Sequence, residues 1–145
     1  MKENYGDISV TSLSGYVVQC EIHRPPNNFF DLELITDLAD CFDDLDTNSQ
    51  CRAIVLCSEG KHFCAGANFQ TPGSKPEGEV MAAKSAHESN PLYTEAVRLF
   101  GNKKPVIAAV QGAAVGGGLG LAMMADFRVA CENTRMTANF VKLGF

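Results

Sequence analysis

Two short runs near the start of the chain alternate apolar and polar side chains, and a period of two is typical of half-buried strands. These runs are residues 8–11 and 16–22, and the Ser-Leu-Ser-Gly segment between them is typical of a hairpin turn. Residues 52–57 form a continuous apolar run, which predicts a strand covered on both faces. The chain is therefore predicted to begin its sheet with two antiparallel strands.

Apolar residues then recur at steps of three and four over residues 32–45, the period of a helix with one buried face, and Asp31 is placed to cap its amino end. Further helices are predicted over residues 91–100, ending at Gly101, and over about 117–124. Strands are predicted over residues 106–110 and 127–130. Residues 58–89 are rich in Gly, Pro and Lys, which predicts a long surface loop with one helical piece around residues 80–86.

Strands that alternate with helices indicate an α/β fold, and the composition indicates a single domain over residues 1–145. The chain is 46% hydrophobic, and its 12 basic and 17 acidic side chains give a net charge of -5. Such a charge disfavours nucleic acid as a partner. No apolar stretch approaches the ~20 residues of a membrane span, and no signal peptide is recognised, so we expect a cytoplasmic protein.

The six cysteines form no C-x-x-C motif and are expected to be reduced. No metal site is expected. The acidic residues of the first predicted helix are interpreted as a solvated helix surface; they are Asp37, Asp40, Asp43 and Asp44.

A glycine-rich segment, residues 111–120, lies between a predicted buried strand and an apolar helix, so its backbone amides gather at a helix amino end. It matches neither the dinucleotide-binding fingerprint nor the P-loop, since Leu121 and Gly118 stand where those motifs need a small residue and a lysine. Close packing of helix on strand is the alternative reason for the glycines.

A second small-residue segment, residues 62–68, also follows a predicted strand. Because the carboxyl ends of parallel strands face one side of a sheet, N–H groups of the two segments are expected to converge on one ligand oxygen. Two such donors form an oxyanion hole.

The motifs FCAGAN at residues 63–68 and KPVIAAVQGAAVGGG at 104–118, with RPPNNF at 24–29 and ADFRVA at 125–130, resemble the crotonase (enoyl-CoA hydratase/isomerase) superfamily. The resemblance implies a spiral of ββα units, acyl-CoA thioesters as substrates, and assembly into trimers or hexamers. It covers about the first half of the family fold and lacks the carboxyl-terminal helical region. Coenzyme A enters as part of the substrate, and no separate cofactor is implied.

By this resemblance, the N–H groups of Ala67 and Gly117 form the oxyanion hole that stabilises a thioester enolate. The further contacts implied for the acyl-CoA are Arg24, Pro26, Asn28, Ala65, Gly66, Asn68 and Gly116. Arg24 is expected to face a phosphate of coenzyme A, with an exposed turn residue as the alternative.

The chain departs from the family at the two glutamates that activate water in hydratases, because Gly120 and Phe140 align with them. Simple hydration is therefore disfavoured relative to isomerase or lyase chemistry. The candidates for a replacement base are His87, Glu88, Tyr93 and Glu95, each more readily interpreted as a surface residue. His62 and Cys64 are interpreted as a surface histidine and a packed cysteine, and Asp126 as a structural hydrogen-bond acceptor.

Two functional hypotheses follow. The first is an acyl-CoA isomerase or lyase of this family, active in fatty acid metabolism. The second is a non-catalytic acyl-CoA-binding or assembly module, either a pseudoenzyme or a truncated product. A strand and a helix face that the missing half would cover are expected to be exposed and to favour association. A nucleotide-binding α/β protein is the weaker third hypothesis.

Overall fold

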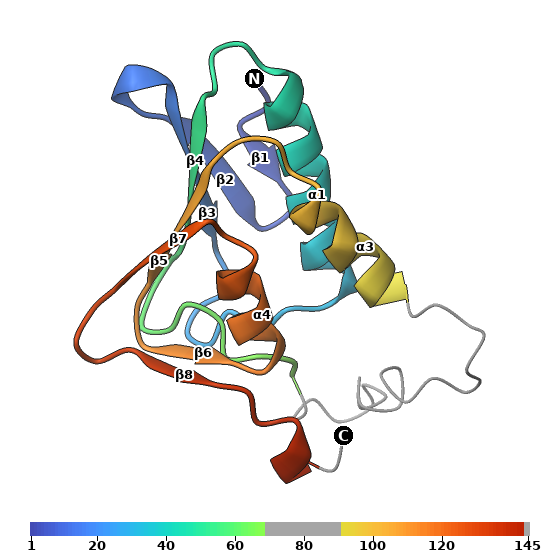
Figure 1. The fold of residues 1–145 in the computed structure, drawn as a ribbon, viewed down its shortest axis with the longest axis vertical. Helices are drawn as coiled ribbons and strands as arrows, with labels where there is room; N and C mark the ends of the chain where they lie inside the picture. Colours follow the sequence, from blue (N-terminus) through green and yellow to red (C-terminus); the bar gives the residue numbers. More distant parts are fainter. Residues whose placement is uncertain (69–90, 144–145) are drawn as a thin grey trace.

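A six-stranded sheet forms the centre of the computed structural model, which describes residues 1–68 and 91–143 (Figure 1). Its strand order is β1-β2-β3-β4-β5-β7, antiparallel from β1 to β3 and parallel from β3 to β7. Two further strands, β6 and β8, pair in parallel as a separate small sheet. The bounds are β1 Asn4–Tyr5, β2 Ile8–Ser12, β3 Val17–Ile22, β4 Ala53–Ser58, β5 Val106–Val110, β6 Ala113–Val115, β7 Phe127–Ala130 and β8 Arg135–Thr137.

Three α-helices and two 3-10 turns complete the described ranges: α1 Leu32–Thr47, α3 Pro91–Phe100, α4 Gly117–Met123, η1 Ser14–Tyr16 and η2 Val141–Leu143. In α1 the predicted cap is confirmed, because Asp31 Oδ1 accepts a hydrogen bond of 2.9 Å from the Leu34 N–H. The apolar face of α1 is buried, with Leu38 and Phe42 at 0% and 1% exposure. Helices α1 and α3 lie side by side at one side of the sheet (Figure 1).

The predicted α/β fold and the hairpin are confirmed, and the helix over residues 91–100 and the strands over 106–110 and 127–130 have the predicted bounds. Strands β6 and β8 were not predicted. They pair with each other through backbone bonds across about twenty residues, so neither carries a local signal. Residues 69–90, with the helical piece expected around residues 80–86, lie outside the described residues.

The prediction that residues 52–57 form a strand covered on both faces is wrong for one face. Along β4, Ile54 and Leu56 are fully buried, whereas Val55 and Cys57 remain half-buried. An apolar residue in a strand is therefore no proof that its face is covered, because apolar atoms also form much of a protein surface.

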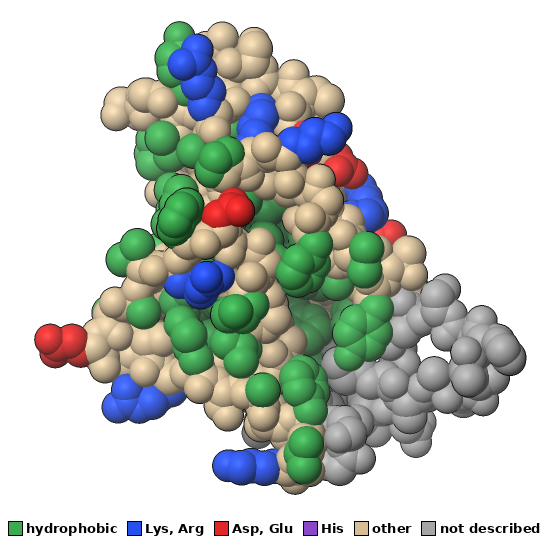
Figure 2. All heavy atoms as spheres, in the orientation of Figure 1, with side chains coloured by type: hydrophobic (Ala, Val, Ile, Leu, Met, Phe, Trp, Pro, Cys, Tyr) green, Lys and Arg blue, Asp and Glu red, His purple; other side chains and the backbone are tan. Residues whose placement is uncertain are grey.

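The opposite end of the sheet is exposed. Every residue of β7 and β8 is exposed, and Phe127 and Val129 keep 64% and 65% of their surface. Apolar side chains gather on the face of the molecule that Figure 2 shows. The expected exposure of an apolar strand is thus confirmed, and association through it stays a prediction. None of the described helices has both the length and the apolar character needed to cross a membrane.

Candidate active site

The two small-residue segments lie directly against each other. The Phe63 N–H donates to the Gln111 carbonyl at 2.8 Å, and the Cys64 N–H donates to the Ala113 carbonyl at 3.0 Å. In return the Val115 N–H donates to the Cys64 carbonyl at 3.0 Å. The two segments thus lie side by side through direct backbone pairing, and convergence of their N–H groups on one ligand oxygen stays a prediction.

Glycines make this approach possible. A Cβ atom on Gly118 would lie 2.1 Å from the Cys64 carbonyl oxygen, and one on Gly66 would lie 2.9 Å from the Val115 carbonyl oxygen. Gly66 also has a φ of +95°, which side-chain-bearing residues rarely adopt. Close packing, the alternative explanation for the glycines, is thus one of their roles.

Ala67 and Gly117 are brought close to this junction, and both backbone N–H groups are available. Within residues 1–68 and 91–143, neither N–H donates to another protein group. Ala67 is 8% exposed, and Gly117 is the first residue of α4. Donors without a protein partner are what a bound oxygen atom requires.

Phe30 connects these two positions, and sequence reasoning missed it. Its N–H donates to the Gly66 carbonyl at 3.1 Å, and it forms an isolated parallel bridge with Ala67. Its ring lies against Gly117, where an added Cβ would be 2.1 Å from the ring Cζ. Its place directly after the motif at residues 24–29 was the available signal.

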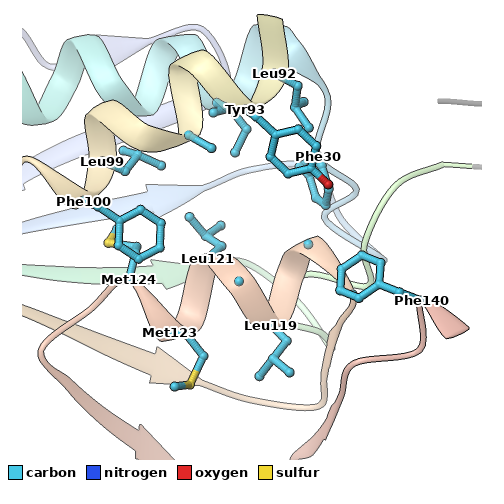
Figure 3. Close-up of a pocket in the computed structure, with 15 residues that line it drawn as sticks. Phe30, Leu92, Tyr93, Leu99, Phe100, Leu119, Leu121, Met123, Met124 and Phe140 are labelled. Atoms are coloured by element: carbon cyan, nitrogen blue, oxygen red, sulfur yellow. The ribbon is translucent and has the colours of Figure 1, made fainter. Parts of the chain in front are cut away.

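A cavity of about 340 Å³ opens beside Gly117, between α3 and α4 (Figure 3). Its described lining has no Lys, Arg, Asp, Glu or His side chain, and the Tyr93 hydroxyl is its one titratable group. From the two helices the cavity is lined chiefly by Leu92, Phe100, Leu119, Leu121, Met123 and Met124. Such an apolar hollow is suited to a hydrocarbon group.

Gly120 and Phe140 both line this same cavity. A Cβ on Gly120 would meet no atom within 4 Å, so the position has room for a side chain. Neither residue offers a group that moves a proton. The two positions aligned with glutamates therefore face one cavity that contains no carboxylate among its described lining residues.

Arg24 is held by carboxylates. Its Nε lies 2.6 Å from Asp7 Oδ2 and its Nη1 lies 2.7 Å from Asp31 Oδ2, with Glu33 at 3.8 Å. Burial opposes its charge, but the hydrogen bonds to Asp31 and Asp7 outweigh burial and raise its pKa. The alternative of an exposed turn residue is wrong, since its side chain is 18% exposed. Contact with a phosphate stays a prediction.

Asn28 holds the turn to the loop that leads into the second small-residue segment. It is fully buried, and its amide nitrogen donates to the Glu59 and His62 carbonyls at 2.8 and 2.6 Å. Its Oδ1 accepts from the Arg24 N–H at 2.9 Å. With these bonds made, Asn28 positions the backbone around it and has no free group directed at solvent.

The remaining residues predicted to contact an acyl-CoA lie in or next to the same backbone segments. The Ala65 N–H donates to the Asn27 carbonyl at 2.9 Å, and the Gly116 N–H donates to the Thr137 carbonyl at 2.9 Å. Gly116 also lines the cavity, whereas Pro26 is exposed and Asn68 is half-buried. Their contacts with an acyl-CoA stay predictions.

The candidate bases have separate places. His87 and Glu88 lie outside the described residues. Glu95 forms an ion pair with Arg98, which also bonds Asp40 and Asp43 of α1, and Glu95 does not line the cavity. The structure therefore gives no support to Glu95 as a base. Tyr93 does line the cavity and is half exposed.

The interpretations of Cys64 and Asp126 are confirmed, whereas His62 is half-buried and hydrogen-bonded and is not a simple surface residue. His62 Nδ1 accepts from the Ala113 N–H at 3.1 Å, and Cys64 is fully buried, which raises the pKa of its thiol to about 11. They form no thiol–imidazole pair. Asp126 Oδ2 accepts from the Val106 N–H at 2.8 Å. Within the described ranges no cluster of His, Cys, Asp and Glu side chains is arranged to hold a metal ion.

Comparison with known proteins gives consistent matches. The family model for enoyl-CoA hydratase/isomerase matches residues 13–145. A protein named "Probable enoyl-CoA hydratase" from Bacillus subtilis is 32% identical over 133 residues, covering 89% of this chain and 48% of that protein. The mitochondrial delta(3,5)-delta(2,4)-dienoyl-CoA isomerase of Mus musculus is 30% identical over 149 residues, covering 97% of this chain and 45% of that protein.

Among solved structures, an enoyl-CoA hydratase from Shewanella pealeana superposes with a TM-score of 0.77 at 32% identity, covering 97% of this chain and 52% of that one. The chain spans about half the length of the curated relatives it matches.

Proposed function

Since this chain belongs to the enoyl-CoA hydratase/isomerase family, we propose that it binds an acyl-CoA thioester and stabilises the thioester enolate through the N–H groups of Ala67 and Gly117. The observation that carries the proposal is that both N–H groups lack a protein acceptor in the described ranges. Both also adjoin Phe30, beside an apolar cavity that suits the acyl group.

The chemistry follows from where charge develops. Removal of a proton from the carbon next to a thioester carbonyl moves negative charge onto the carbonyl oxygen. Two fixed N–H donors stabilise that oxygen more strongly in the transition state than in the ground state. The apolar surroundings strengthen this interaction because they screen it less than water does.

The proposed reaction class is enolate chemistry on a thioester: isomerisation, hydrolysis, decarboxylation or retro-Claisen cleavage. Hydration is disfavoured, because Gly120 and Phe140 provide no carboxylate to orient and deprotonate water. Introducing both carboxylates, in Gly120→Glu combined with Phe140→Glu, is the direct way to ask whether hydration of an enoyl-CoA then appears.

The test of the oxyanion hole is Gly117→Ala. The new methyl group would overlap the Phe30 ring and shift the N–H, so exchange of the acyl α-proton in D₂O should fall by ~10²–10³, as for loss of one such donor. Proton NMR of an acyl-CoA measures the exchange. Gly15→Ala is the control for a destabilising glycine substitution outside the cavity: Gly15 lies in the β2–β3 turn with a φ of +72°, so alanine is strained there although its methyl meets no atom within 4 Å, and exchange in the folded variant should be unchanged. A folded Gly117→Ala protein with wild-type exchange would contradict the proposal.

The second candidate is a non-catalytic acyl-CoA-binding or assembly module, favoured by the lack of a carboxylate in the described cavity lining and by the exposed β7 strand. Under this function the chain binds acyl-CoA without exchanging its α-proton. Gly117→Ala would then leave the mass measured by light scattering unchanged. A homo-oligomer, a trimer or hexamer as the family resemblance implies, is the expected state under either function.

A further inference from the structure

We propose that the acyl group held by the cavity is uncharged and carries an aromatic ring. This inference rests on the proposed acyl-CoA function and narrows its substrate class. Three properties of the cavity carry the inference: the absence of charge in its described lining, its volume, and the placement of its aromatic side chains.

The lining of the cavity disfavours a charged acyl group. Among the described lining residues no side chain can pair with a carboxylate or an ammonium group, and the Tyr93 hydroxyl is the single side-chain hydrogen-bond donor. Moving an unpaired charge from water into such surroundings is strongly unfavourable. Acyl groups that end in a second carboxylate should therefore bind far more weakly than apolar groups of similar length.

The volume of the cavity limits the size of the acyl group that it can hold. An apolar cavity of about 150 Å³ holds one benzene molecule, and this cavity measures about 340 Å³. A two- to four-carbon acyl chain would leave most of that space without contacts, and unfilled apolar space forfeits dispersion energy. The cavity therefore has room for a ring together with the carbons that join it to the thioester.

The aromatic side chains favour a ring over a linear chain. Phe30, Tyr93, Phe100 and Phe140 all line the cavity (Figure 3); Tyr93 and Phe100 are both on α3, whereas Phe30 and Phe140 come from other parts of the chain. Phe30 contacts Gly117, so one of these rings adjoins the N–H expected to hold the thioester oxygen. Aromatic pairs in offset or edge-to-face geometry gain energy beyond that of buried area alone. A substrate ring beside the α-carbon would make such pairs, whereas an alkyl chain would not.

The experiment compares unreactive thioether analogues of coenzyme A by calorimetric titration of the purified chain. All three carry eight-carbon groups, S-(2-phenylethyl)-CoA, S-octyl-CoA and S-(7-carboxyheptyl)-CoA, and free coenzyme A is the baseline. The phenylethyl analogue should bind about 2- to 10-fold tighter than the octyl analogue, the range of one aromatic pair. The carboxyl analogue should bind no better than free coenzyme A.

Two variants assign the preference to the cavity. Phe140→Leu should reduce the preference for the ring, since one of the four aromatic side chains is lost, and leave binding of the octyl analogue within about twofold, because leucine retains most of the apolar contact. Phe127→Leu, on exposed β7 and outside the cavity, should leave all affinities unchanged.

Octyl binding as tight as phenylethyl binding, or a preference that Phe140→Leu leaves undiminished, would overturn the inference and leave the proposed function standing. If no analogue bound better than free coenzyme A, the proposed acyl-CoA function would fail with it.

Discussion

The side of the sheet against α1 and the edge strand β7 both contain large apolar residues and have opposite environments. On the first side, Leu34 and Leu38 are fully buried, and Phe42 keeps 1% of its surface. On the second, Phe127 and Val129 keep about two thirds of theirs, at 64% and 65%. The cavity lies between α3 and α4, and Gly117 is the first residue of α4.

This contrast shows that the chain covers one part of its fold by itself and leaves another open. β7 is the last strand of its sheet, so one edge has backbone groups that no strand within the described residues pairs. An apolar strand with an open edge is a surface for association. The fold therefore combines a firmly packed region around α1 with an exposed apolar strand that other protein can still cover.

A matched pair of phenylalanine substitutions tests most directly whether α1 is packed and β7 is exposed in solution. Phe42→Ala removes a buried ring and should lower the free energy of unfolding by ~3–5 kcal/mol. Phe127→Ala, at an exposed position, should change it by no more than ~0.5 kcal/mol in the monomer. Urea unfolding at low protein concentration measures both. Equal losses would mean that β7 is packed in solution and that the contrast is wrong.

The reactivity of two cysteines, buried Cys64 and exposed Cys131, gives a second test of the difference between covered and exposed regions. Burial raises the pKa of the Cys64 thiol to about 11, whereas a hydrogen bond with the Thr134 hydroxyl lowers the pKa of exposed Cys131. The thiolate is the reactive form, and one pKa unit is a tenfold change in its population. At pH 7, iodoacetamide should therefore modify Cys131 at least ~100-fold faster than Cys64, as read by peptide mass spectrometry.

The sign of the pH dependence follows from the same values. Cys64 keeps its proton more firmly in the folded than in the unfolded chain, so its contribution to stability is present below about pH 9 and lost toward pH 11.

For the iodoacetamide experiment, labelling after denaturation is the control, and it should make the modification rates of Cys64 and Cys131 similar. Equal rates in the folded protein would contradict the burial of Cys64.

The smallest expected effect concerns the attachment of α3 to α1. α3 buries only Leu92 and Leu99, and Arg98 joins it to α1 through Asp40 at 2.7 Å and Asp43 at 2.5 Å. Hydrogen bonds to Asp43 and Asp40 raise the pKa of Arg98. Because these pairs are solvent-exposed, Arg98→Met should lower the free energy of unfolding by only ~0.2–1 kcal/mol.

Salt separates this charge effect from lost packing. In 1 M NaCl the difference between wild type and Arg98→Met should shrink, since the Debye length falls to ~3 Å. Arg52→Met is the matched control, because Arg52 lies over the Tyr16 ring at 4.3 Å and its effect should depend less on salt. A difference at Arg98 that salt leaves intact would assign its role to packing.

Much of the fold was predictable because its signals are local. The period of apolar residues located α1, α3, β5 and β7, and Asp31 marked the start of α1 through the chemistry of its own side chain. β6 and β8 escaped prediction because each depends on the other, far along the chain. Exposure of an apolar strand was expected only from the family resemblance, and the structure shows that this strand is β7, since sequence alone does not distinguish a covered strand from an open one.

The candidate site divides in the same way. The sequence determined which segments carry glycines and small residues, and with them where backbone N–H groups gather. Tertiary structure decided that Phe30 joins the two segments and that Tyr93 faces the cavity while Glu95 pairs with Arg98. Residues of a helix turn by about 100° each, so two side chains two positions apart point in nearly opposite directions. Only the packing of α3 against α1 fixes which of them faces the cavity.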